Sequence, residues 1–299
     1  MATAEKVNKY KKNKNAGTSD KSAGTSGHGR ERIRLSTEKF KPSNELHRYP
    51  IILYGEKKIG KTTLLSQFPH AYSFMFEPND SYELYKNDIL DWQDFIDLIP
   101  QFLQGEHEFE SCWIDNGRNC YEMALDYVCR KMSIEHPSQQ NDFGQTWAKV
   151  FKAFALPIRQ LMQSKYGFGV TCHQVEKDIE TRTGRTFVQM SPDLSTAASR
   201  LFCGEIYNIF YYHFEGTERY LQIQGDDYIV AGHRMKKHFL TTKGEHVHRI
   251  PMGNSEEEAY ENLICAFDNK QENTYARAQE TKEESAGKKF KKSKTKVKA

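Results

Sequence analysis

Residues 55–62 read Gly-Glu-Lys-Lys-Ile-Gly-Lys-Thr and fit the phosphate-binding pattern G-x-x-x-x-G-K-T. A nucleoside triphosphate is a dense anion, so the loop must turn backbone N–H groups toward it, which Gly55 and Gly60 permit. The Lys61 ammonium would then reach the β- and γ-phosphates, and the Thr62 hydroxyl would ligate Mg²⁺. We therefore expect ATP and Mg²⁺ as cofactors. The expected nucleotide-binding residues are Gly55, Glu56, Lys57, Lys58, Ile59, Gly60, Lys61, Thr62 and Thr63.

A carboxylate at the end of an apolar run is the first expected partner of this loop. Asp115 ends the run Ser-Cys-Trp-Ile-Asp, where a parallel sheet would deliver its side chain to the nucleotide crevice. Mg²⁺ needs a hard oxygen ligand besides Thr62, so we expect Thr62 and Asp115 to hold the metal together. Alternatively, Asp115 only forms a turn or caps the next helix, as the sequence Asp-Asn-Gly would allow.

A second carboxylate, Glu77, follows the apolar run 71–76, one helix after the loop. From a strand end at that place, a carboxylate would face the water in line with the γ-phosphate and act as general base or orient that water. The alternative is a solvated strand end without a chemical role.

His173 and Gln174 follow the apolar run 167–172 and would sense the γ-phosphate from another strand end. A loop role is the alternative, and a metal site is disfavoured because no second His or Cys lies at ligand spacing. The expected catalytic set is thus Lys61, Glu77, Asp115, His173 and Gln174.

The basic cluster at 234–237 has two interpretations. It is either a solvated loop or a finger that stabilises transition-state charge on the nucleotide of a neighbouring subunit. The candidates for that finger are Arg234 and Lys236.

The elements that must position these residues alternate between strand and helix patterns. We expect strands at 50–54, 71–76, 111–115 and 167–172, and helices at 61–68, 91–103 (interrupted at Pro100), 118–134, 147–163 and 194–202. A hairpin at 178–187 and two antiparallel strands at 205–214 and 219–224 follow. Trp92, Trp113 and Trp147 fall on apolar stripes and are expected in the core. The fold class is therefore α/β, with a mostly parallel sheet flanked by helices and antiparallel strands at its C-terminal end.

Charge is distributed unevenly along the 299 residues, whose net charge is +3. Residues 1–48 contain 12 Lys/Arg against 5 Asp/Glu, and residues 269–299 contain 10 against 4, which leaves −10 on residues 49–268. The apolar-poor ends cannot bury enough surface to fold. We expect a disordered basic tail at 1–46, an ATPase domain at 47–268 and a disordered Lys-rich tail at 269–299.

The C-terminal lysines could neutralise nucleic-acid phosphates without reading sequence, or serve solubility alone. They are Lys288, Lys289, Lys291, Lys292, Lys294, Lys296 and Lys298. The six cysteines form no C-x-x-C pair, which indicates free thiols in a reducing compartment. No run has the length of a membrane span and the N-terminus has no apolar signal core, so we expect a cytoplasmic protein without membrane contact.

Taken in order, these motifs resemble the RecA-like P-loop ATPase core, and within it the phage ATP-binding proteins of the Sak type, relatives of the RecA and RadA recombinases. The resemblance runs from Tyr49 to His238, most of the expected domain. It rests on the phosphate loop, on Phe-Met-Phe-Glu before Pro78, on Cys-Trp-Ile-Asp before Asn116, and on Val-Thr-Cys-His-Gln-Val-Glu-Lys ending at Lys177. The chain departs from the family at Lys57 and Lys58, where small residues or proline are frequent, and at Asn116, where Ser is common.

The resemblance implies ATP hydrolysis coupled to single-stranded DNA handling in recombination, annealing or repair, in the host cytoplasm if a phage encodes the protein. It also implies a homo-oligomer, ring or filament, with nucleotide sites near the subunit interfaces. The alternative is a nucleotide-gated adaptor with little turnover that recruits single-strand-binding protein or a helicase. A small-molecule kinase is disfavoured because no arginine-rich lid segment follows the phosphate loop.

Overall fold

The computed structural model describes residues 35–276, and the chain divides into two compact units, residues 1–42 and 43–299. The described part of the first unit, residues 35–42, contains no helix or strand. All helices and strands of residues 35–276 belong to the second unit.

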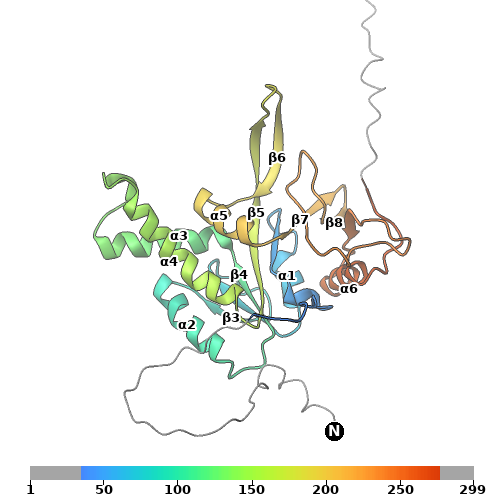
Figure 1. The fold of residues 1–299 in the computed structure, drawn as a ribbon, viewed down its shortest axis with the longest axis horizontal. Helices are drawn as coiled ribbons and strands as arrows, with labels where there is room; N and C mark the ends of the chain where they lie inside the picture. Colours follow the sequence, from blue (N-terminus) through green and yellow to red (C-terminus); the bar gives the residue numbers. More distant parts are fainter. Residues whose placement is uncertain (1–34, 277–299) are drawn as a thin grey trace, which may run out of the picture. The chain divides into compact units, whose positions relative to one another are not determined.

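One sheet with helices on both faces organises this unit (Figure 1). Its strands are β1 (Ile51–Gly55), β2 (Ala71–Met75), β3 (Tyr85–Asp88), β4 (Ser111–Asp115), β5 (Gly167–Glu180), β6 (Thr186–Pro192), β7 (Asn208–Glu215), β8 (Glu218–Gln222) and β9 (Arg249–Pro251). The spatial order is β3-β2-β4-β5-β1-β7-β8-β9, and β6 pairs with the outer half of β5. The pairs from β3 to β7 are parallel, whereas β7-β8-β9 and β5-β6 are antiparallel. The expected fold class is therefore confirmed.

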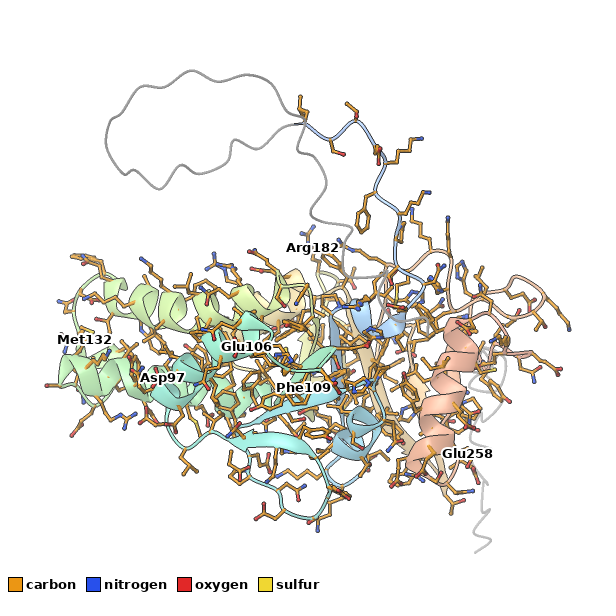
Figure 2. All side chains as sticks on the ribbon, turned by 90° about the horizontal axis from the view of Figure 1, so that it is seen from below. Asp97, Glu106, Phe109, Met132, Arg182 and Glu258 are labelled. Atoms are coloured by element: carbon orange, nitrogen blue, oxygen red, sulfur yellow. The ribbon has the colours of Figure 1, made fainter. Side chains whose placement is uncertain are left out.

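The helices form two layers because the strand side chains alternate between two cores. Ile52 and Tyr54 of β1 join the core under α2–α5, whereas Ile51 and Leu53 join the core under α1 and α6. The helices are α1 (Lys61–Ser66), α2 (Trp92–Gln104), α3 (Gly117–Met132), α4 (Gln145–Met162), α5 (Thr196–Glu205) and α6 (Glu256–Phe267), with short 3-10 turns at Leu46–Arg48 and Pro137–Gln139. The α3–α4 pair projects as a helical hairpin with Met132 at its outer end (Figure 2). None of the helices in residues 35–276 is long and apolar enough to cross a membrane.

Several expected elements need correction. Helix α2 continues through Pro100, because Phe95, Ile99 and Phe102 bury one face of it and this packing outweighs the lost backbone hydrogen bond. Trp147 is 40% exposed and not in the core, since it lies in the first turn of α4, where its ring packs edge-on against that of His136.

Other corrections concern extent. Strand β5 runs past Cys172 into the β5–β6 hairpin, whose turn contains Arg182 (Figure 2). Strands β3 and β9 and helix α6 were not expected, although Ser255 caps α6 and its apolar residues recur at helical spacing. The boundary at residue 268 lies too early, since Gln271 and Thr274 accept backbone hydrogen bonds from Thr242 and His248.

Candidate nucleotide site

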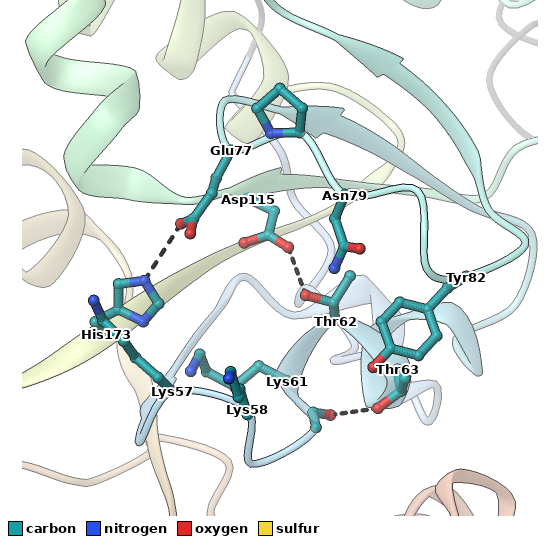
Figure 3. Close-up of a pocket in the computed structure, with 12 residues that line it drawn as sticks. Lys57, Lys58, Lys61, Thr62, Thr63, Glu77, Asn79, Tyr82, Asp115 and His173 are labelled. Atoms are coloured by element: carbon teal, nitrogen blue, oxygen red, sulfur yellow. Dashed lines mark hydrogen bonds and ion pairs between the residues drawn. The ribbon is translucent and has the colours of Figure 1, made fainter.

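A cleft of about 360 Å³ opens at the carboxyl edge of the parallel strands (Figure 3). Strand register brings its residues together: Gly55 of β1 pairs with His173 of β5, and Met75 of β2 pairs with Asp115 of β4. Segments more than 100 residues apart in the chain therefore meet at one place. The cleft is lined by Lys57, Lys58, Gly60, Lys61, Thr62, Thr63, Glu77, Pro78, Asn79, Tyr82, Asp115 and His173.

Two glycines shape the phosphate loop, each for its own reason. A Cβ on Gly55 would lie 1.9 Å from the carbonyl oxygen of Tyr212 on β7, so only glycine fits between the strands. Gly60 has φ +105°, a left-handed conformation that side chains rarely adopt, and it precedes the first residue of α1. Lys58 also has a positive φ, +64°, and its side chain lines the cleft.

Lys61 is only 8% exposed, and its ammonium donates hydrogen bonds to loop carbonyl oxygens, Gly55 O at 3.1 Å and Glu56 O at 2.5 Å. Burial lowers the pKa of Lys61 to about 8, and the nearby carboxylate of Asp115 opposes that shift. Among residues 35–276, the hydrogen-bond partners of this cation are therefore carbonyl oxygens of the loop itself.

Asp115 lies between two threonine hydroxyls that donate to opposite oxygens of its carboxylate. Thr62 Oγ1 is 2.6 Å from Asp115 Oδ2, and Thr171 Oγ1 is 2.5 Å from Oδ1. The structure thus brings together the two residues that we expected to hold Mg²⁺. Hydroxyl and carboxylate oxygens are the ligands that this metal prefers, so the donor set fits it. Thr171 binds the carboxylate oxygen that Thr62 does not, and no sequence motif indicated this contact.

Glu77 reaches the same cleft from the segment after β2. Its Oε2 accepts a hydrogen bond from the side-chain amide of Asn116 and lies 3.3 Å from His173 Nε2. The other ring nitrogen of His173, Nδ1, is buried and has no hydrogen-bond partner among residues 35–276. Sequence reasoning noted Asn116 only as a departure from the family pattern and missed its contact with Glu77.

Gln174 does not line the cleft. Because side chains alternate along a strand, it points away from His173, and its Oε1 accepts a hydrogen bond of 3.0 Å from the Tyr211 hydroxyl. The structure therefore separates the expected His173–Gln174 pair, with the histidine in the cleft and the amide against β7.

Asn79 and Tyr82 form a further wall that the sequence analysis did not identify. They follow Glu77 in the segment between β2 and β3, and Tyr82 lies near Thr63 at the start of α1 (Figure 3). Its ring is 45% exposed. The sequence Pro-Asn-Asp-Ser-Tyr at 78–82 is typical of a turn, and nothing in it indicates that Asn79 and Tyr82 line the cleft.

The expected finger residues lie at the opposite edge of the sheet. Arg234 and Lys236 are exposed, and the Arg234 guanidinium stacks over Tyr207, the residue before β7. Since the loop follows β1 and β1 runs parallel to β7, neither residue reaches the cleft of its own chain. The expected DNA-binding lysines, 288–298, lie outside the described residues.

Comparison with known proteins gives one family match. A family model described as an AAA domain matches residues 47–235, more than half of the chain, and this stretch contains every residue of the cleft. No curated protein matches the chain.

Proposed function

The chain belongs to the AAA domain family, whose members are P-loop ATPases, and from this premise we propose that it hydrolyses ATP with Mg²⁺ and acts on single-stranded DNA. The observation that supports hydrolysis is the convergence of Lys61, Glu77 and the Thr62–Asp115 pair on one cleft. A site built only to bind a nucleotide has no need of a second carboxylate there.

The proposed binding step uses the loop and the outer wall. Lys61 exchanges its two carbonyl partners for the β- and γ-phosphates, while the loop amides from Glu56 to Thr63 surround the anion. The exposed ring of Tyr82 offers a flat surface for the purine base. Thr62 and Asp115 would hold Mg²⁺, which supplies charge neutralisation on the phosphates.

In the proposed hydrolysis, Glu77 accepts a proton from the water that attacks the γ-phosphorus, and ADP leaves from the opposite side. The side-chain amide of Asn116 donates to Oε2 of Glu77 and so holds this carboxylate in one orientation, toward the proposed position of the water. His173 is the proposed γ-phosphate sensor, because it contacts Glu77 and because its strand, β5, continues into the β5–β6 hairpin. Gln174 would report the same state to Tyr211 on β7.

Three substitutions test the ATPase. Lys61→Ala should abolish both binding and turnover, and Asp115→Asn should remove Mg²⁺-dependent binding. Glu77→Gln should retain binding of Mg-ATP while turnover falls by about 10²-fold or more, because it removes only the base. Phosphate release and nucleotide titration of the same preparations measure this. A Glu77→Gln variant as active as the wild type would refute the base, and a wild-type protein without turnover would refute the ATPase.

The finer proposal is a protein of the Sak type, active in recombination, annealing or repair of single strands, with ATP turnover that rises with DNA. It is supported by the order of motifs along residues 49–238 and by the Lys-rich residues 288–298. We also propose a homo-oligomer, ring or filament, in the cytoplasm, with single-strand-binding protein as partner, and basic tails that bind DNA.

The alternative proposal is a nucleotide-gated adaptor that recruits single-strand-binding protein or a helicase. It is favoured by the departures at Lys57 and Lys58 in the loop. Turnover measured with and without single-stranded DNA separates the two, because an adaptor binds ATP but shows negligible hydrolysis under both conditions.

A further inference from the structure

Helix α4 carries a strip of positive charge that the nucleotide site does not use. Although residues 49–268 have a net charge of −10, α4 contains no Asp or Glu. Lys149 and Lys152 are exposed one turn apart, and Arg159 follows two turns later. The strip therefore presents cations on one face over about 15 Å.

Contacts extend this strip onto α5. The guanidinium of Arg200 lies 5.3 Å from the ring centroid of Phe151, and that of Arg159 lies 6.0 Å from the same ring. Arg159 also forms an ion pair with Glu205 at 2.5 Å, so that this pair carries no net charge. Among the described residues, the unpaired cations of these two helices are Lys149, Lys152 and Arg200. Cations and an aromatic ring thus alternate across two helices.

An exposed tyrosine continues the surface beyond α5. Tyr207, two residues after Glu205, is 50% exposed, and the Arg234 guanidinium lies 3.9 Å above its ring. A backbone bridge between Ile209 and Gly232 holds the two segments side by side. We call the whole surface the α4–α5 band. Its residues are Lys149, Phe151, Lys152, Arg159, Arg200, Tyr207 and Arg234.

We infer that the α4–α5 band binds single-stranded DNA in the folded body, separately from the tail lysines. Proteins that bind single strands place cations along the phosphate backbone. Between these cations they present aromatic rings and flat guanidinium groups, on which the unpaired bases stack. A duplex keeps its bases stacked inside and would leave Tyr207 and the outer face of Arg234 without partners. The inference rests on the proposed function for its choice of DNA, but not on ATP turnover.

The band is distinct from the nucleotide cleft. Tyr207 precedes β7, whereas the phosphate loop follows β1, and these two strands are parallel. Tyr207 and the guanidinium of Arg234 therefore lie at the sheet edge opposite the cleft, and none of the band's residues lines the cleft, so that DNA binding can be measured without nucleotide.

Charge removal in the full chain tests the phosphate contacts. We expect the triple variant Lys149→Gln, Lys152→Gln, Arg200→Gln to bind a fluorescent oligothymidylate more weakly. The slope of log K against log salt should fall by about 2, since each lost phosphate contact removes about 0.7 for single strands. Anisotropy titrations over a KCl series without nucleotide measure it. The matched control, Lys131→Gln, Lys243→Gln, Lys270→Gln, removes as many exposed charges elsewhere and should leave the slope unchanged.

Tyr207 provides a second measurement that changes no charge. Tyr207→Ala should weaken oligothymidylate binding by about tenfold, whereas Tyr207→Phe keeps the ring and should bind like the wild type. Binding of a duplex should not distinguish the two variants. Thermal unfolding of each variant verifies that it is folded.

Three results would overturn the inference: an unchanged salt slope in the triple variant, an equal loss in the control variant, or Tyr207→Ala binding as tightly as Tyr207→Phe. Wild-type protein that fails to bind oligothymidylate would contradict both the inference and the proposed DNA function. Wild-type protein that binds DNA but does not hydrolyse ATP would contradict only the proposed ATPase.

Discussion

At the scale of single residues, the contact between Asn116 and Glu77 would set how precisely the proposed base faces the attacking water. The Asn116 amide donates to Glu77, while its own oxygen accepts from the backbone of Asn119 at the start of α3. One side chain thus ties the proposed base to a helix end. A general base needs such fixed geometry, because small displacements of the reacting groups cost large factors in rate.

Replacing Asn116 by Asp tests this positioning role. Aspartate keeps the helix cap but sets a second negative charge against Glu77, which favours the protonated base. We expect kcat to fall by about tenfold to a hundredfold, and the acid limb of the pH–rate profile to move to higher pH, with Mg-ATP affinity retained. Asn141→Asp, at an exposed position that does not line the cleft, is the matched control. An unshifted acid limb would leave Asn116 with a purely structural role.

Lys61 is expected to make nucleotide affinity depend on pH in the alkaline range. Burial lowers its pKa to about 8, so that the ammonium loses its proton as the pH rises through that value. We expect the affinity for ATP to be constant below pH 8 and to fall by up to about tenfold per pH unit above it, because the neutral amine no longer attracts phosphate. Titration with a fluorescent ATP analogue between pH 7 and 9.5 measures this.

The control is Lys61→Arg, whose guanidinium stays charged over the same range. Its affinity should be lower at pH 7 but without the alkaline decline. A wild-type affinity that is flat up to pH 9.5 would mean that the Lys61 charge does not titrate there.

At the scale of elements, the site depends on how closely β4 and β5 approach each other. Trp113 of β4 lies across Gly169 of β5, where a Cβ would come within 1.9 Å of the indole ring. The same ring packs edge-on against Phe68 just after α1. This contact sets the spacing of the strands whose ends carry Asp115 and His173.

Gly169→Ala should therefore lower the free energy of unfolding by about 1–3 kcal/mol through overpacking. Adding Trp113→Leu should restore part of the loss, since the smaller side chain leaves room for the methyl group. Gly204→Ala in α5 is the control: a Cβ there meets no atom within 4 Å, and stability should rise by up to about 1 kcal/mol. Urea unfolding measures all three, and a Gly169→Ala protein as stable as the wild type would contradict the predicted clash.

At the scale of the whole molecule, the position of Arg234 constrains any catalytic role for it. It lies at the edge of the sheet opposite its own cleft, so that it can reach only the nucleotide of another subunit. Lys236 is exposed two residues after Arg234, and its backbone N–H donates to the carbonyl oxygen of Arg234, so the same constraint applies to it. The trans-acting proposal therefore requires an oligomer.

Mixing two variants tests this requirement. Arg234→Ala keeps an intact cleft but lacks the finger, and Lys61→Ala keeps the finger but lacks the cleft. If Arg234 acts in trans, each preparation alone should show little turnover, and a mixture should recover part of the wild-type rate, because some clefts then face an intact finger. Phosphate release in titrated mixtures measures the recovery. Full activity of Arg234→Ala alone would exclude the finger role.

Much of the architecture could be predicted from local patterns. Glycine spacing and the following Lys-Thr pair indicated the phosphate loop, and the short apolar runs gave β1, β2 and β4 within about one residue of their observed ends. Short or polar elements escaped prediction, as β3 (Tyr85–Asp88) did, because its pairing partner β2 stabilises it more than its own residues do.

By itself, the sequence indicated which side chains would line the cleft, because Lys61 and Thr62 follow from a contiguous motif and Asp115 and Glu77 from the ends of apolar runs. Only the tertiary structure decided how these groups are held: Thr171 behind Asp115, Asn116 against Glu77, and Gln174 turned away toward Tyr211. The physical reason is that strand register joins segments far apart in the chain, and no local spacing encodes which hydroxyl or amide a neighbouring strand will present.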